Sequence, residues 1–77
     1  MLRKEIEHWE TYKDVMDRGS VRTLHEIMGD VVKSYEEIEP EFKRMLADDP
    51  SDTIVEGILA DLERVRAIMV EMEPHLS

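Results

Sequence analysis

The sequence predicts an all-α protein, a three-helix bundle built on a long antiparallel helical hairpin. Apolar residues recur in alternating steps of three and four along three stretches, which is the spacing that places side chains on one side of an α-helix. Glycine and proline stand near the ends of these stretches, where they commonly interrupt helices. The predicted helices span residues 2–18, about 24–47 and 50–73.

The first predicted helix, residues 2–18, ends before Gly19. Glycine often adopts the left-handed conformation that caps a helix C-terminus. Lysine, arginine and glutamate alternate between the apolar positions, as on a helix with one solvated side. The apolar face is formed by Leu2, Ile6, Trp9, Tyr12 and Met16.

The second predicted helix begins at a capping box, in which Thr23 and Glu26 each satisfy a backbone N–H that the first turn leaves unpaired. Pro40 falls inside this helix, yet the apolar spacing keeps its phase on both sides of it. One bent helix over residues 24–47 is therefore preferred to two helices that meet at Pro40, and both alternatives stay open. The apolar face consists of Leu24, Met28, Val31, Tyr35, Ile38, Phe42 and Met45.

The third predicted helix spans residues 50–73. We expect Asp49 to cap its N-terminus, Pro50 to occupy the first turn, where a missing N–H is harmless, and Pro74 to stop it. The acidic link over residues 48–52 is short, so the second and third helices should form an antiparallel hairpin. The apolar face consists of Val55, Ile58, Leu62, Val65, Met69 and Met72.

Size and composition indicate a single helical domain over residues 1–77. Hydrophobic residues make up 42% of the chain and charged residues 38%, a balance that suits a folded domain with a solvated exterior. The absence of cysteine excludes disulfides and thiolate metal sites. No apolar run approaches the ~18 residues of a membrane span and no signal segment is evident, so we expect no membrane association and a cytoplasmic protein.

A homodimer is expected from the small size of the chain, because a second subunit would add to a limited core. Val15, Val32 and Val70 lie off the predicted apolar faces and leave more apolar surface than three helices hide. Trp9 is expected in the core or at a subunit interface, since aromatic residues commonly anchor interfaces. These four residues are the candidates for the dimer interface.

The net charge is −9, and most of it lies in the middle of the chain. Residues 36–63 contain ten acids and two bases, whereas the flanking segments are nearly neutral. Such a surface repels nucleic-acid phosphates and attracts a basic protein surface, so no direct nucleic-acid binding is expected. The predicted partner-binding face consists of Glu36, Glu37, Glu39, Glu41, Asp48, Asp49 and Asp52.

Glu5 and His8 form a Glu-x-x-His pair, the spacing with which di-iron helical bundles supply metal ligands from one helix. A complete site needs a second such pair, which a symmetric dimer would supply. This is the weaker alternative, since neither residue lies at a predicted core position. No other spacing of residues indicates a catalytic or cofactor site.

The function predicted from the sequence is a non-catalytic protein–protein interaction module of the inhibitor, antitoxin or DNA-charge-mimic type, without a cofactor. Its acidic face is expected to dock on a basic partner, and to do so faster at low salt. Two alternatives stay open: a small metal-dependent ferritin-like bundle formed across a dimer, and a structural subunit of a larger assembly. Stoichiometric metal would favour the first, and association that survives high salt would favour the second.

Overall fold

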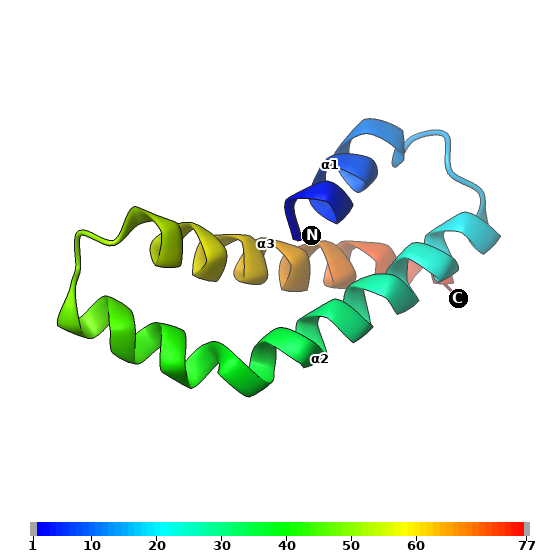
Figure 1. The fold of residues 1–77 in the computed structure, drawn as a ribbon. Helices are drawn as coiled ribbons and strands as arrows, with labels where there is room; N and C mark the ends of the chain where they lie inside the picture. Colours follow the sequence, from blue (N-terminus) through cyan, green and yellow to red (C-terminus); the bar gives the residue numbers. More distant parts are fainter. Residues whose placement is uncertain (1, 77) are drawn as a thin grey trace.

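The computed structural model describes residues 2–76, and this part of the chain is all-α. It contains three helices, α1 (Leu2–Tyr12), α2 (Arg18–Asp48) and α3 (Thr53–Leu76), and no strand within the described range (Figure 1). The all-α prediction is therefore confirmed. Between residues 2 and 76 no helix combines the length and the apolar character that a bilayer crossing requires.

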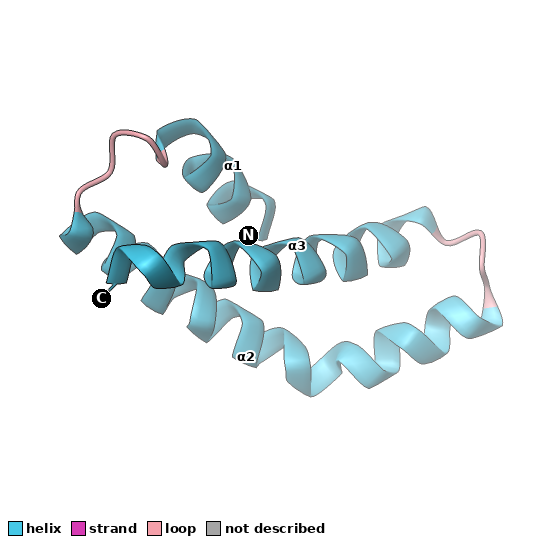
Figure 2. Ribbon diagram, turned by 180° about the vertical axis from the view of Figure 1, so that it is seen from behind, coloured by secondary structure: helices cyan, strands magenta, loops and turns pink. Residues whose placement is uncertain are grey.

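Helices α2 and α3 run antiparallel, and α1 packs over only one end of the pair (Figures 1 and 2). The helix lengths explain why the coverage is partial. At ~1.5 Å per residue, the 11 residues of α1 reach about 16 Å, whereas the 31 residues of α2 reach about 46 Å. Two ion pairs join α1 to α3, Arg3 to Asp61 at 3.3 Å and Glu10 to Arg64 at 3.6 Å.

The main core lies where all three helices meet. Every side chain in it is apolar, and several are fully enclosed: Met28, Val65 and Ile68 are 0% exposed and Leu62 is 1% exposed. Burial of this apolar surface is the main favourable contribution to folding. The core cluster consists of Leu2, Ile6, Trp9, Val21, Leu24, Met28, Val32, Leu62, Val65, Ile68 and Met72.

The core is small at the end of the hairpin that α1 does not cover. Val55 is buried at 3% exposure but lies outside the main cluster, so the far end of the hairpin has only a small core of its own. Ile38 and Met45 on α2, predicted to be core residues, are 44% and 48% exposed. Their apolar face was identified correctly, but no third helix extends far enough to cover it.

The first helix ends earlier and the second begins earlier than the sequence predicted. Helix α1 stops at Tyr12, not at residue 18. Asp17 is the N-cap of α2: its Oδ1 accepts a hydrogen bond from the Ser20 N–H at 2.7 Å, and this bond lowers the pKa of the Asp17 carboxyl. The predicted capping box is wrong, because Thr23 lies inside α2 and its hydroxyl donates to the Gly19 carbonyl at 3.0 Å.

The α2–α3 turn also differs from the prediction. Asp49 does not cap α3; its Oδ1 accepts from the Ser51 N–H at 3.2 Å and from the Ser51 hydroxyl at 2.6 Å, which shapes the turn. The cap is Asp52, whose Oδ1 accepts from the Val55 N–H at 3.1 Å. Pro50 lies in the turn, before α3 begins at residue 53. Pro74 does not end α3 but lies in its last turn, two residues before the helix ends at Leu76.

The question that the sequence left open at Pro40 is answered in favour of a single helix. Helix α2 continues across Pro40 to Asp48 and is bent along its length (Figure 1). A proline inside a helix removes one backbone hydrogen bond and clashes with the preceding turn, which is the usual cause of a bend.

Candidate functional site

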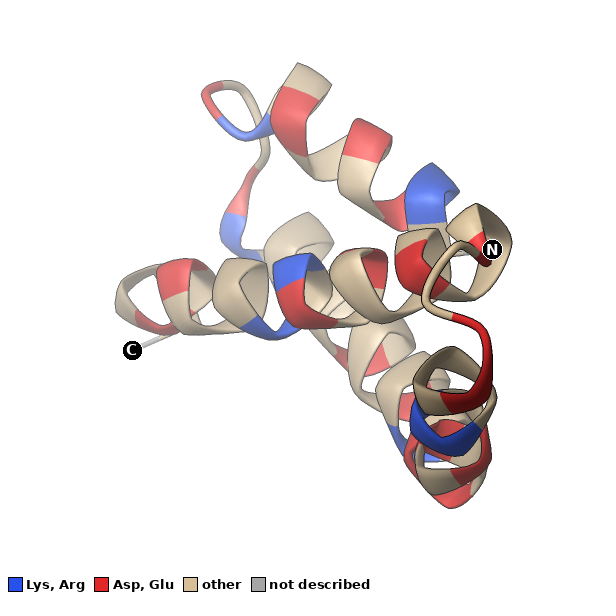
Figure 3. Cartoon of the chain, turned by 90° about the vertical axis from the view of Figure 1, so that its left-hand side faces the viewer, with Lys and Arg blue, Asp and Glu red and all other residues tan. Residues whose placement is uncertain are grey.

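The acidic residues of the chain gather at the end of the hairpin that α1 does not cover. We call residues 36–63 the distal half: the end of α2, the turn and the start of α3. Figure 3 looks at the molecule from this end, and acidic stretches follow the turn and both helices that flank it. Ten acids and two bases give the distal half a net charge of −8.

Glu39 makes the closest ion pair between the two long helices among the members of the predicted acidic face. Its carboxylate accepts two hydrogen bonds from Arg66 of α3, at 2.9 and 3.2 Å, and lies 3.6 Å from Lys43. The side chain is only 14% exposed. The hydrogen bonds from Arg66 lower the pKa of Glu39, so its charge is used inside the fold and is not available to a partner.

Arg66 gathers two further acids at the same place. It pairs with Glu63 one turn before it on α3, and its Nη2 lies 3.9 Å from Glu36 Oε2 on α2. The hydrogen bond to Glu39, followed by that to Glu63, raises the pKa of Arg66 further above its ordinary value. One cation thus balances part of the negative charge between the helices, and the predicted face loses Glu36 and Glu39 as fully free carboxylates.

Three other predicted acids have local roles. Glu41 pairs with Arg44 at 3.0 Å, and Asp49 and Asp52 shape the turn and cap α3. Among the described residues, Glu37 and Asp48 make no ion pair and no side-chain hydrogen bond, and both are exposed.

Glu56 is a member of the distal acidic surface that the sequence analysis did not select. It lies in the first turn of α3, is exposed, and its carboxylate has no partner within residues 2–76. The available signal was its place in the segment of ten acids, but the predicted face was drawn only from the second helix and the turn. Within the described distal half, Glu37, Asp48 and Glu56 are the exposed carboxylates that make no ion pair and no hydrogen bond.

An uncovered apolar face lies in the same distal half, and Glu37 and Asp48 flank it on α2. On α2, Ile38 and Met45 follow Ile27 by 11 and 18 residues, close to three and five helical turns, so they share the side that α1 faces. On α3, Asp61 pairs with Arg3 of α1. Gly57 and Ile54 lie one and two helical turns before Asp61, so they share the side of α3 that α1 faces. We call Ile38, Met45, Ile54 and Gly57 the distal face.

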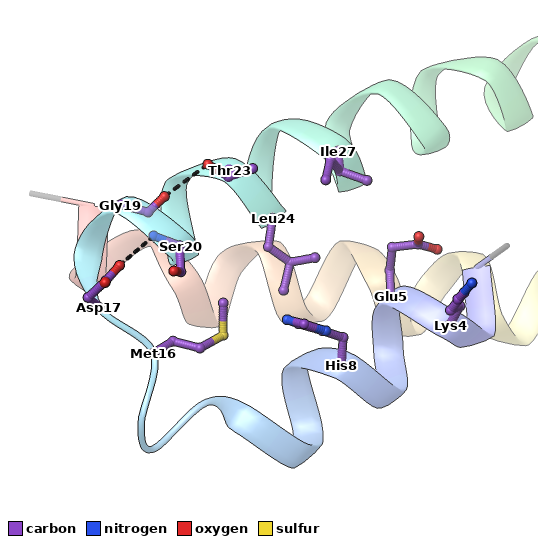
Figure 4. A pocket seen from close by; sticks show the side chains of 10 residues that line it. All are labelled: Lys4, Glu5, His8, Met16, Asp17, Gly19, Ser20, Thr23, Leu24 and Ile27. Atoms are coloured by element: carbon purple, nitrogen blue, oxygen red, sulfur yellow. Dashed lines mark hydrogen bonds between the residues drawn. The ribbon is translucent and has the colours of Figure 1, made fainter.

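A groove of about 780 Å³ separates α1 from the start of α2 (Figure 4). The predicted metal pair, Glu5 and His8, lies on its α1 wall, and the Glu5 Oε2 atom is buried without a hydrogen-bond partner. The α2 wall opposite them includes the apolar side chains of Leu24 and Ile27. Within residues 2–76 no three His, Asp or Glu side chains are grouped to hold a metal ion.

The four predicted dimer-interface residues divide into two pairs. Trp9 and Val32 are 2% and 7% exposed and belong to the core of the single chain. Trp9 also donates its indole N–H to Glu71 Oε2 at 3.1 Å, which lowers the pKa of Glu71. Their burial therefore needs no second copy, whereas Val15 and Val70 are 78% and 62% exposed.

The described side chains of the distal half thus form an exposed, negatively charged surface next to exposed apolar side chains. Unpaired carboxylates beside exposed apolar side chains can attract and hold a cationic partner. A search of known protein families, of curated proteins and of solved structures finds no match to this chain.

Proposed function

We propose that this protein is a non-catalytic binding module whose distal half docks on a basic surface of another protein. The observation that carries the proposal is that Glu37, Asp48 and Glu56 are exposed and make no internal ion pair, within a segment of net charge −8. Internal pairing has already used Glu39 and part of Glu36, so the remaining carboxylates define where the partner binds.

Electrostatic attraction of this kind acts mainly on the rate of encounter. The charge is concentrated at one end of a molecule whose longest dimension is 43 Å, and the rest of the chain has a net charge near −1. A basic partner would therefore be oriented as it approaches. Binding should weaken with added salt, because the screening length falls from roughly 10 Å at 0.1 M to about 3 Å at 1 M ionic strength.

Charge reversal of the unpaired carboxylates tests the proposal. The variant Glu37→Lys, Asp48→Lys, Glu56→Lys leaves the turn, the α3 cap and the Arg66 pairs intact. Its matched control reverses Glu7, Asp14 and Glu26, which are also exposed and unpaired among the described residues. Both variants change the net charge from −9 to −3, so they differ only in where the change lies.

The readout is capture of proteins from lysate of the native host at low and at high salt, followed by mass spectrometry. We expect the unchanged protein and the control to retain a basic partner that high salt releases, and the distal variant to lose it. Equal capture by both variants would contradict the proposal, and so would a partner whose retention does not depend on salt.

The proposal extends to the finer architecture expected from the sequence, a three-helix bundle that forms a homodimer in the cytoplasm. Val15 and Val70 are the dimer candidates whose side chains are exposed. Light scattering at two protein concentrations, on the unchanged chain and on Val15→Ser, Val70→Ser, tests the dimer. A structural subunit is the second candidate function, favoured by the exposure of Ile38, Met45 and Ile54, and it predicts association that high salt leaves intact.

A further inference from the structure

We propose that the distal face binds a basic amphipathic helix of the partner protein, laid along the hairpin beyond the end of α1. The inference rests on the proposed function and names the part of the partner that the distal half would take.

The first argument is that the hairpin already accepts one helix on this side. Over its covered end, α1 buries Leu2, Ile6 and Trp9 to between 2% and 8% exposure. The same sides of α2 and α3 continue past α1 with apolar residues, because Ile38 and Met45 keep the phase of Ile27. A helix that followed α1 along the hairpin would therefore meet the same kind of surface.

The second argument is that this part of the surface is open. Ile54 is 75% exposed, and a Cβ added at Gly57 would meet no atom within 4 Å. By contrast, Gly29 faces α3 closely enough that an added Cβ would lie 3.6 Å from Met69. Three exposed large apolar side chains and a bare glycine make a surface that costs free energy in water. An amphipathic helix with apolar residues at steps of three and four would cover it.

The third argument concerns charge, and it favours a basic helix over a second copy of this chain. Two distal halves packed on one another would bring together two segments of charge −8. Helix α1 of a second copy would not compensate, since Leu2–Tyr12 carries two bases and three acids. A helix with lysine or arginine beside its apolar stripe would instead place cations near the unpaired Glu37 and Asp48, which flank Ile38 and Met45 on α2.

The test uses the full chain and three labelled synthetic peptides of about 14 residues, roughly 21 Å long as helices. The first is a leucine–lysine peptide with an amphipathic helical pattern, the second has the same residues in scrambled order, and the third replaces lysine by glutamate. Binding is measured by fluorescence anisotropy. Amide chemical shifts identify the site: Gly57 should respond to the first peptide and Gly19, at the other end of α2, should not.

Two serine variants separate the distal face from exposed apolar residues in general. Met45→Ser, Ile54→Ser removes two side chains of the distal face, and Val15→Ser, Val70→Ser removes two equally exposed side chains elsewhere. We expect the first variant to bind the amphipathic basic peptide at least about tenfold more weakly than the unchanged protein does, and the second variant to bind it with unchanged affinity. Circular dichroism checks that both variants keep their helical signal.

The outcomes distinguish this inference from the proposed function. If the scrambled basic peptide binds as tightly and the serine variants have no effect, the distal-face inference is overturned while electrostatic docking stands. If neither basic peptide binds, both fail. If the glutamate peptide binds as tightly as the lysine peptide, the occupant of the distal face is not a basic helix. The same holds if the unchanged protein self-associates and Met45→Ser, Ile54→Ser abolishes that self-association, because a second copy then covers the distal face.

Discussion

Replacing two aliphatic residues of α3, Leu62 and Ile54, by alanine tests where the core ends. The residues lie eight positions apart on the same helix, and their exposures are 1% and 75%. Leu62 faces the region where all three helices meet, whereas Ile54 belongs to the distal face. The structure predicts that two chemically similar changes have very different effects on the free energy of unfolding.

The expected magnitudes follow from burial. A buried leucine changed to alanine typically costs about 2–5 kcal/mol, and a chain of 77 residues is typically stable by about 4–12 kcal/mol. Leu62→Ala should therefore remove a large part of the free energy of unfolding. Full burial of isoleucine contributes about 1.5–3 kcal/mol, so a side chain with only about a quarter of its area covered contributes about 0.4–0.8 kcal/mol. The better helix propensity of alanine offsets up to about 0.7 kcal/mol of this loss.

Thermal and urea unfolding, both followed by circular dichroism, measure the two variants at two protein concentrations. In a domain of this size 1 kcal/mol corresponds to about 4–8 °C in the thermal midpoint. Leu62→Ala should lower the midpoint by about 10 °C or more, and Ile54→Ala should leave it within a few degrees. The unfolding curve of Ile54→Ala should not depend on protein concentration.

A loss of more than about 1.5 kcal/mol for Ile54→Ala would refute the reasoning, because an uncovered side chain cannot contribute that much. A midpoint that rises with concentration in the unchanged protein and not in Ile54→Ala would identify a second copy as the cover. A Leu62→Ala variant as stable as the unchanged chain would contradict the three-helix core itself.

Three further predictions concern charge, capping and the bend. Arg66 depresses the pKa of Glu39 in the folded state, so the stability contributed by this pair is present above about pH 4.5 and is lost as the pH falls through the folded pKa. In that acidic range, the urea midpoint of Glu39→Gln should change less with pH than the urea midpoint of the unchanged protein. Asp17→Ala should lower the thermal midpoint and Thr23→Ala should scarcely change it, the reverse of what the capping box predicts. Pro40→Ala should straighten α2, strengthen the helical signal and raise stability by up to about 3 kcal/mol; a lower midpoint would mean that packing requires the bend.

Helix ends were the least predictable part of the fold, and the α1–α2 link shows why. Two residues able to cap a helix, Asp17 and Thr23, lie only six positions apart, and the sequence pattern predicted only the second, because it matches a capping box. The chain uses the first, since an earlier start adds helical backbone bonds and brings Val21 into the core at 2% exposure. The local sequence pattern does not show how much stability the burial of Val21 and the added backbone bonds contribute.

The apolar faces were predicted in direction but not in extent. Met69 was expected on the apolar face of the third helix, yet it is only partly buried, whereas the neighbouring Ile68 is fully buried. The reason is that α3 packs against two neighbours, and α1 covers the side on which Ile68 lies. Val32 is also buried, at 7% exposure, although its spacing suggested an exposed position.

The sequence by itself determined the helical class, the hairpin and the concentration of negative charge in its outer half. These properties depend on spacing within a helix, on the length of one link and on composition, which are all local. Only the tertiary structure decided which carboxylates remain free and which apolar side chains remain open. Glu39 is neutralised by Arg66, a residue 27 positions away, and Ile38 and Met45 are exposed because α1 packs over the other end of the hairpin (Figure 1). Periodicity shows which side of a helix is apolar; how far a neighbour covers that side is set by packing between segments distant in the sequence.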